Sequence, residues 1–255
     1  FRESIQKTGS DVSPGLAFKA ALVGAGVARL IPAGGAITPV ALSWTVRDEV
    51  EASTAGPGIR TVLLNYAGLL IMAGAGVAMD RPRGTIPVFS TSLVVVAPIV
   101  LAIGVLLMFG SGRLGSISRY LPRFIRTKVE KSMINHRAGW ESQAFIWGRL
   151  VLEASALWLV MRAFGLDLTL SQAVADFAVS QLIGGLPGTP GGLGVIELGM
   201  GVVLAAYGFP GRSAVAPILV YRVVSYWLPA GLSFLAGGST FLASDEAKAH
   251  AADAD

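Results

Sequence analysis

The stretch that decides the fold is residues 187–222, which read PGTPGGLGVIELGMGVVLAAYGFPGRSAVAPILVYR. A Pro/Gly-rich break opens it, and two apolar runs follow, the first carrying Glu197 and the second Arg222. In a bilayer, a broken helix survives only where protein or water satisfies its free backbone groups. Charged side chains inside apolar runs are costly there and mark a binding site or a pathway. The stretch therefore predicts membrane-embedded helices around a polar site.

The rest of the chain has the composition of a membrane protein. Hydrophobic residues make up 53% of the 255 residues and charged residues 14%, and the mean hydropathy is +0.64. This apolar excess lies outside the range of ordinary soluble domains. The apolar runs are solid rather than alternating, which argues against a transmembrane β-barrel. We expect an all-α, polytopic integral membrane helical bundle with two helices that are broken by Pro/Gly or re-entrant.

Apolar runs recur along the whole chain. A membrane span needs about 20 helical residues. Candidate helices lie at residues 15–31, 40–54, 60–79, 86–110, 144–165, 169–186, 193–208 and 213–237. The sequence leaves open whether 193–208 crosses the bilayer or re-enters. We expect a polar N-terminal segment at 1–14, a transmembrane domain at 15–238 and a disordered tail at 239–255.

Residues 111–142 are a polar, basic exception among the apolar runs. Apolar side chains recur among the cations at helical spacing, namely Ile117, Leu121, Phe124, Ile125 and Val129. The pattern predicts an amphipathic helix on an anionic lipid surface, and a solvated cytoplasmic loop is the alternative. In both cases the positive-inside rule places the segment on the cytoplasmic face. We expect it to bind anionic lipid or a lipid-modifying enzyme.

Two breaks interrupt the apolar runs in a similar way. The first reads Pro32-Ala-Gly-Gly35 with Pro39 beyond it, and the second occupies 187–192 with Gly194 beyond it. Paired breaks in the two halves of a transport protein point to a substrate site, although a glycine-rich chain could repeat such a pattern by coincidence. A helix that starts near Leu193 also offers free N–H groups to an anion. The predicted head-group site includes Gly34, Gly35, Gly191, Gly192 and Gly194.

Ionisable side chains lie inside several apolar runs. Each costs roughly 2.5–3.5 kcal/mol at mid-bilayer on insertion scales, so they must face the bundle interior or a hydrated cavity. Arg149 and Glu153 are four residues apart, which predicts a structural ion pair on one helix face. For the others, one interpretation is structural pairing, for instance of Glu197 with Arg222. The alternative is a cavity where arginine binds a phosphate-bearing head group. The charged and phenolic residues assigned to this predicted site are Arg29, Asp176, Glu197, Tyr221 and Arg222.

Other ligand classes find no support in the sequence. His136 and His250 lie far apart in polar segments, and the chain has no cysteine. We therefore expect neither a metal nor a cofactor, and no nucleic-acid partner. A nucleotide-binding loop and a catalytic triad are both missing from the sequence, so no catalytic residue is assigned and no enzyme activity is expected.

The C-terminal third carries a family resemblance. LPGTPGGLGVIELGM (186–200) followed by AVAPILVYRVVSYWLP (214–229) resembles the C-terminal signature of the lysylphosphatidylglycerol synthase transmembrane-region family. That family includes the flippase domain of bacterial multiple peptide resistance factors. RLVLEASALWLVMRAFGLDLTLSQAVADF (149–177) fits its spacing, whereas IPAGGAITPVALSWTVR (31–47) fits more loosely. The resemblance extends well over 143–237 and implies an integral membrane protein that moves aminoacylated or other lipids between leaflets.

The resemblance also implies roles for individual positions. By motif, Glu197 and Arg222 match charged positions of the family, and Arg47 matches its N-terminal arginine. A glutamate expected after the first Gly stretch is absent, because Ala36-Ile37-Thr38 stands there. The Arg and Asp expected in the next span are replaced around Asn65-Tyr66. A lysyl-lipid specificity is therefore not carried over.

These patterns predict a flippase-like translocator that moves a charged-head-group phospholipid or glycolipid between leaflets of the bacterial cytoplasmic membrane through a central polar cavity. One alternative is a non-catalytic membrane partner of a lipid-modifying or glycosyl-transferring enzyme. Another is a membrane enzyme for a lipid-linked substrate, with Glu197 or Asp176 as acid or base. Small-residue faces such as Gly74/Ala78 and Gly201/Ala205 would permit a homodimer. A start at Phe1 rather than methionine fits a fragment that lacks upstream helices.

Overall fold

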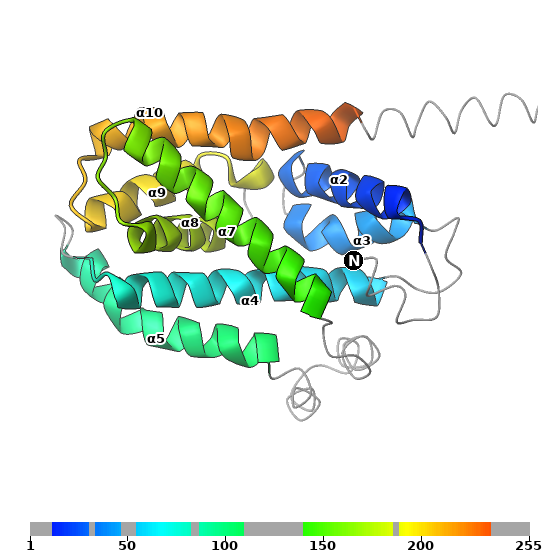
Figure 1. Ribbon diagram of the computed structural model, residues 1–255, viewed down its shortest axis with the longest axis horizontal. Helices are drawn as coiled ribbons and strands as arrows, with labels where there is room; N and C mark the ends of the chain where they lie inside the picture. Colours follow the sequence, from blue (N-terminus) through cyan, green and yellow to red (C-terminus); the bar gives the residue numbers. More distant parts are fainter. Residues whose placement is uncertain are drawn as a thin grey trace, which may run out of the picture.

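The computed structural model describes residues 12–30, 34–46, 55–82, 87–109, 140–185 and 189–235. Within these ranges the chain is helical and has no β-strand (Figure 1). The helices are α2 (Pro14–Leu30), α3 (Gly34–Thr45), α4 (Ala55–Met79), α5 (Pro87–Phe109), α7 (Trp140–Ala163), α8 (Leu170–Gly184), η4 (Pro190–Gly192), α9 (Val195–Ala206), α10 (Gly211–Arg222) and η5 (Val223–Trp227). The predicted all-α class is confirmed. The tail at 239–255 and nearly all of 1–14 and 111–142 lie outside the described residues.

Among the described residues, four helical segments are long and apolar enough to cross a membrane, namely Thr61–Met79, Phe89–Met108, Gln143–Ala163 and Gly211–Leu235. The outer faces of these segments carry large apolar side chains. On α5, the side chains of Val95, Ile99 and Ile103 are 62%, 58% and 45% exposed. A continuous apolar surface of this kind suits lipid rather than water. The predicted polytopic membrane bundle is therefore confirmed.

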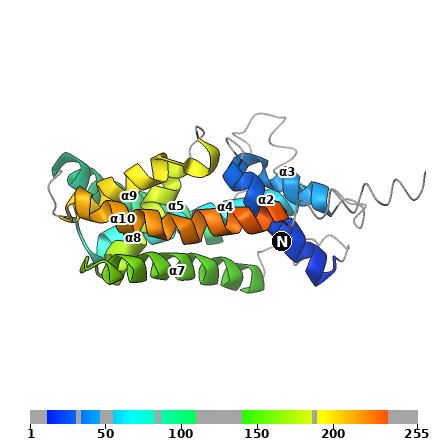
Figure 2. The same ribbon diagram turned by 90° about the horizontal axis from the view of Figure 1, so that it is seen from above.

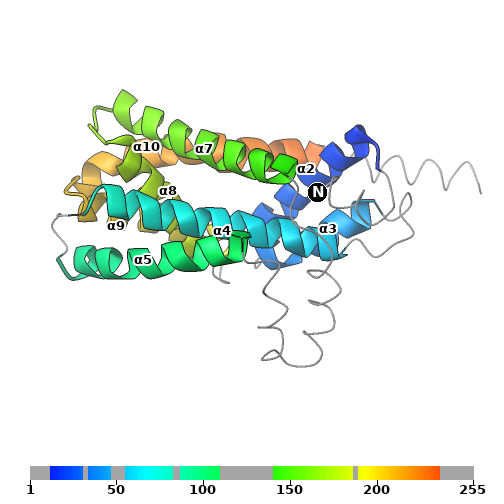
Figure 3. The same ribbon diagram turned by 60° about the horizontal axis from the view of Figure 1, so that its bottom comes forward.

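α4 and α5 lie side by side (Figure 3) and pack with almost no space between their backbones. A Cβ atom at Gly74 would lie 2.7 Å from the Ala97 carbonyl oxygen, and one at Gly104 would lie 2.9 Å from that of Ala67. Small residues allow such close helix approach. Gly74 belongs to a small-residue face expected to permit close helix packing, and it makes such a contact inside the chain. An added Cβ at Gly201 meets no atom within 4 Å, and the homodimer stays a prediction.

α8 is the central helix, and its first turn is held by a capping box. Thr169 Oγ1 accepts a hydrogen bond from the Gln172 N–H at 3.2 Å, and Gln172 Oε1 accepts one from the Thr169 N–H at 3.1 Å. This reciprocal pair satisfies two backbone donors that the helix leaves free. α8 packs on α4, α7 and α9, and its fully buried Phe177 belongs to the main hydrophobic core. This packing fixes the helices that carry the polar site.

The ends of α3 and α4 differ from the prediction of a helix over 40–54. α3 begins at Gly34, includes Pro39 and ends at Thr45. The Gly56-Pro57-Gly58 triplet, which follows the helix predicted over 40–54, lies in the first turn of α4. Proline is tolerated in a first turn because its missing N–H would have no intrahelical acceptor there. A Pro/Gly cluster therefore marks a helix start here, not a helix end.

At the second break, η4 leads into α9 and lies next to α2 and α3 (Figure 2). α9 has 12 residues, and a helix of that length spans about 18 Å, which is less than the hydrocarbon core of about 30 Å. α10 continues through η5, a π-helical turn in which the Leu228 N–H donates to the Val223 carbonyl oxygen, and on to Leu235. The far end of this long helix packs beside α2, since a Cβ atom at Gly26 would lie 2.7 Å from Ser233 Cβ. The described part of the second break, residues 189–192, thus lies on the side of α2 and α3.

Candidate functional site

The second break forms a tight loop that requires glycine. Gly191, Gly192 and Gly194 have φ angles of 56°, 68° and 81°, in the left-handed region where other residues carry a steric cost. Space is also limiting at Gly191, where a Cβ atom would lie 2.2 Å from Tyr226 Cε2 and 2.7 Å from the Arg29 carbonyl oxygen. The loop therefore packs directly against α2 and η5.

The two charges of the deciding stretch form an ion pair. Arg222 Nε donates to Glu197 Oε1 at 2.6 Å, and the two side chains are only 6% and 20% exposed. Glu197 Oε2 accepts the Gly194 N–H at 2.7 Å, which satisfies a free backbone donor at the start of α9. The helix N-terminus that we expect to hold an anion is thus capped by the chain's own carboxylate. Glu197 orients Arg222 and is not part of the cavity wall described below.

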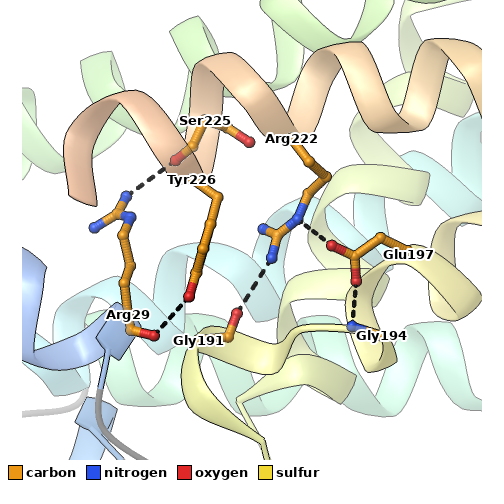
Figure 4. A network of polar contacts seen from close by, with 7 residues as sticks. All are labelled: Arg29, Gly191, Gly194, Glu197, Arg222, Ser225 and Tyr226. Carbon is orange, nitrogen blue, oxygen red and sulfur yellow. Dashed lines mark hydrogen bonds and ion pairs between the residues drawn. The ribbon is translucent and has the colours of Figure 1, made fainter. Parts of the chain in front are cut away.

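Arg29, Tyr226 and Arg222 join the first and last helices (Figure 4). Arg222 Nη2 donates to the Gly191 carbonyl oxygen at 3.3 Å. Its Cζ lies 4.6 Å from the Tyr226 ring centroid, within cation–π range. Tyr226 Oη donates to the Arg29 carbonyl oxygen at 2.9 Å, and Arg29 Nη2 donates to the Ser225 carbonyl oxygen at 3.3 Å. These contacts tie α2, η4, α9 and η5 into one polar network.

The helices on either side of the first break, α2 and α3, pack against η4 of the second break. Arg29 lies in the last turn of α2, directly before the first break. Gly34 and Gly35 begin α3, but their surroundings lie outside what the structure describes. Their role in a head-group site stays a prediction, and so does the shared substrate site of the two breaks.

A cavity of about 430 Å³ lies beside the network. Arginines from three separate helices line it: Arg29 of α2, Arg149 of α7 and Arg222 of α10. The remaining polar part of its wall includes Asn65, Tyr66, Glu153, Gln181, Thr189, Ser225 and Tyr226. Apolar residues of α2, α3, α4, α7, α8 and α9 also line it. Three guanidinium groups therefore converge on one space inside an apolar bundle.

Arg149 and Glu153 form the predicted ion pair, with Arg149 Nη1 2.7 Å from Glu153 Oε1. Arg149 Nη2 also donates to Asn65 Oδ1 on α4. The sequence predicted only a structural pair at these positions. Both residues in addition line the cavity, because the helix face that they share turns toward α4 and α2.

Asp176 and Tyr221 are not brought to the cavity. Their exposed fractions are 0% and 1%, and neither belongs to the cavity wall. Asp176 Oδ1 accepts from Ser180 Oγ at 3.4 Å, while Asp176 Oδ2 and Tyr221 Oη find no hydrogen-bond partner among the described residues. Their contact with a head group stays a prediction, and the structure places both side chains outside the cavity wall. They face the packed core, and sequence position alone does not tell a buried face from a cavity face.

The substitution Asp176→Asn is expected to stabilise the protein. A buried carboxylate without a counter-ion is costly, and asparagine keeps the shape of the side chain while removing the charge. We expect the unfolding midpoint in lipid nanodiscs at neutral pH to rise by about 2 °C or more, which corresponds to about 1 kcal/mol. Differential scanning fluorimetry measures this shift, and a lower midpoint would show that the carboxylate makes a favourable contact.

Several polar residues of the cavity wall were missed as site residues, although the sequence holds a signal for them. Asn65, Tyr66 and Gln181 interrupt apolar runs, which indicates the bundle interior. Ser225 and Tyr226 follow Arg222 by three and four residues, so they are its neighbours on the helix surface. Thr189 belongs to the break itself, and its Oγ1 is buried without a hydrogen-bond partner among the described residues.

The fold and the site define an integral membrane helical protein with an arginine-lined cavity between two broken segments. The chain belongs to the lysylphosphatidylglycerol synthase TM region family, whose model matches residues 3–233. The resemblance detected over the C-terminal part is thereby confirmed over nearly the whole chain.

Two curated membrane proteins are similar to part of this chain. Both are described as UPF0104 membrane protein, and both come from the archaeon Methanothermobacter thermautotrophicus. They are 34% identical to this chain over 82 and 86 residues, which is 32% of the chain in each case. The matched stretches span 25% and 24% of the relatives, so about a quarter of their length is covered. None of the solved structures matches the chain.

Proposed function

We propose that the chain is a flippase-like translocator of the bacterial cytoplasmic membrane, which moves a charged-head-group phospholipid or glycolipid between leaflets. The cavity wall carries this proposal, because Arg29, Arg149 and Arg222 face one space inside a bundle with an apolar exterior. Its volume of about 430 Å³ falls within the range of about 300–1,000 Å³ of small-molecule sites. Membership in a family named for the synthase of a charged phospholipid supports the same ligand class.

In the proposed mechanism, the cavity replaces water around the head group while the acyl chains stay in the bilayer. A charged head group pays a large penalty in hydrocarbon, and guanidinium groups offset it by charge-assisted hydrogen bonds to phosphate oxygens. The Glu197 carboxylate holds Arg222 in the orientation that the cavity needs, through the 2.6 Å contact between them. Glu197 therefore acts as a positioning residue.

We also propose that the chain is not itself an enzyme. The two oxygens of Glu197 are engaged by Arg222 and by the Gly194 N–H, and Asp176 lies outside the cavity wall. Neither carboxyl group is placed to exchange a proton with a lipid in the cavity.

The basic segment 111–142 is proposed to attract anionic lipid or a lipid-modifying enzyme by its charge.

A leaflet-resolved lipid assay tests the proposal. The protein is reconstituted into proteoliposomes with tail-labelled phospholipids, and dithionite quenching follows the label that reaches the outer leaflet. We expect rapid exchange with the wild type, and the rate of empty vesicles with Arg222→Ala and with Glu197→Gln. Arg162→Gln is the matched control, because Arg162 pairs with exposed Asp167 outside the cavity. Wild-type rates in both cavity variants would remove the ion pair from the mechanism.

A further inference from the structure

The three arginines of the cavity differ in how their charge is balanced. Arg149 and Arg222 each contact a carboxylate at 2.7 Å and 2.6 Å. Arg29 has no carboxylate within ion-pair distance among the described residues, and its guanidinium donates only to the carbonyl oxygens of Ala25 and Ser225, at 3.1 Å and 3.3 Å. A cation held by carbonyl groups alone, in a wall that is otherwise largely apolar, favours an anionic partner.

The charged groups around Arg29 are of both signs, with two arginines against one carboxylate in the cavity wall. Arg149 and Arg222 both lie within electrostatic reach of Arg29, as does the single wall carboxylate, Glu153. Counting Glu197 behind Arg222, three arginines stand against two carboxylates. In a membrane interior this surplus is poorly screened, because Coulomb interactions strengthen as the dielectric constant falls. The cavity is therefore complementary to one net negative charge.

An unused hydroxyl group supports the same partner. Thr189 Oγ1 is buried, has no hydrogen-bond partner among the described residues, and belongs to the same cavity wall as Arg29. Thr189 lies just before η4, whose Gly191 packs against the Arg29 backbone. A hydroxyl group and a guanidinium group in one wall can both donate hydrogen bonds to phosphate oxygens. Arg222, by contrast, already uses its guanidinium on Glu197 and Gly191 (Figure 4).

We propose that the cavity selects a lipid whose head group carries a net negative charge at a phosphate, with Arg29 as the main anchor of that phosphate. This inference rests on the proposed translocator function and deepens it. It predicts that an aminoacylated head group, which brings an added ammonium group, is disfavoured by the positive surplus. The lipid specificity then follows from the net positive charge of the cavity, which attracts an anionic head group and repels a cationic one.

The experiment compares three tail-labelled lipids in the proteoliposome assay: anionic phosphatidylglycerol, zwitterionic phosphatidylcholine and cationic lysylphosphatidylglycerol. We expect phosphatidylglycerol to move at least about tenfold faster than the lysyl lipid. Arg29→Gln should slow phosphatidylglycerol about tenfold or more, because a charge-assisted hydrogen bond is lost. Arg29→Lys should retain part of the rate, and Arg162→Gln should retain all of it.

Lipid binding is measured separately, so that a failure of the anionic selectivity can be distinguished from a failure of the translocator function. Dihexanoyl phosphatidylglycerol should raise the unfolding midpoint of the detergent-solubilised wild type, and Arg29→Gln should abolish the shift. Glycerol phosphate at the same concentration serves as the soluble anion, and an equal shift from it would overturn the lipid assignment. Equal or faster movement of the lysyl lipid, or an unchanged rate with Arg29→Gln, would overturn the anionic selectivity and leave the translocator standing. If no lipid moves, the proposed function itself fails.

Discussion

Replacing Glu197 with alanine is expected to destabilise the protein by about 3–5 kcal/mol, because the Arg222 guanidinium then stays buried without its carboxylate. The Arg222 side chain is only 6% exposed, and its Nε lies 2.6 Å from Glu197 Oε1. The substitution also removes the acceptor of the Gly194 N–H at the start of α9. Since 1 kcal/mol shifts the unfolding midpoint of a chain of this size by roughly 2–4 °C, a fall of about 6 °C or more should be measured in nanodiscs. An unchanged midpoint would contradict the burial of this pair.

A double variant separates the structural role of the pair from its role in transport. Arg222→Met with Glu197→Gln removes both charges, and glutamine keeps a side-chain oxygen for the Gly194 N–H. Buried ion pairs replaced by well-packed neutral residues often lose little stability, so we expect the midpoint to return to within a few degrees of the wild type. If the pair only stabilises the fold, lipid movement returns with stability. Our proposal expects movement to stay at the rate of empty vesicles, and wild-type movement in the double variant would exclude Arg222 from head-group binding.

The convergence of Glu197 and Arg222 was predictable from the sequence, for a physical reason. Two ionisable groups on neighbouring apolar runs cannot both face lipid, so they must meet each other or a cavity. The Arg149–Glu153 pair was predictable because it depends only on helix geometry. Arg29 was assigned to the site from the sequence, but its contact with Ser225 was not predictable, since it joins residues 196 positions apart. Such a contact depends on how α2 docks on the far end of the long C-terminal helix.

Other differences between the expectations from the sequence and the structure have local causes. Asp176 shows the limit of arguing from charge, because a buried carboxyl group can face the core as well as a cavity. The π-helical turn at Val223–Trp227, which directly follows Arg222, has no compositional signature, although such turns are frequent at functional sites. The start of α4 was misplaced because Gly56-Pro57-Gly58 has the composition of a helix end and the position of a first turn.

Gly191→Ala is the second substitution for which we expect a large effect. The residue has a φ angle of 56°, and an alanine in the left-handed region costs about 1–2 kcal/mol. Its Cβ atom would also lie 2.2 Å from Tyr226 Cε2 and 2.7 Å from the Arg29 carbonyl oxygen, and such overpacking typically adds about 1–3 kcal/mol. We expect a total loss of about 2–5 kcal/mol in stability, measured as a lower unfolding midpoint.

The same substitution should damage the site beyond its effect on stability. To make room for the methyl group, the Tyr226 ring must move, and its 2.9 Å hydrogen bond to the Arg29 carbonyl oxygen is then lost. The Gly191 carbonyl oxygen, which accepts from Arg222 at 3.3 Å, shifts as well. Lipid movement should therefore fall about tenfold or more at temperatures well below the unfolding midpoint, where the variant is still folded.

Gly201→Ala supplies the control for Gly191→Ala. A Cβ atom at Gly201 meets no atom within 4 Å, and replacing glycine by alanine inside a helix stabilises it by about 0.5–1 kcal/mol. We therefore expect a small rise in midpoint and normal lipid movement. Tyr226→Leu in the Gly191→Ala background should restore part of the stability, because it removes the ring atom with which the alanine methyl group would clash. If Gly191→Ala matches Gly201→Ala in unfolding midpoint and lipid movement, the proposed role of this loop is wrong. Close packing of the second break against η5 and α2 would then not hold the guanidinium groups of Arg29 and Arg222 in place.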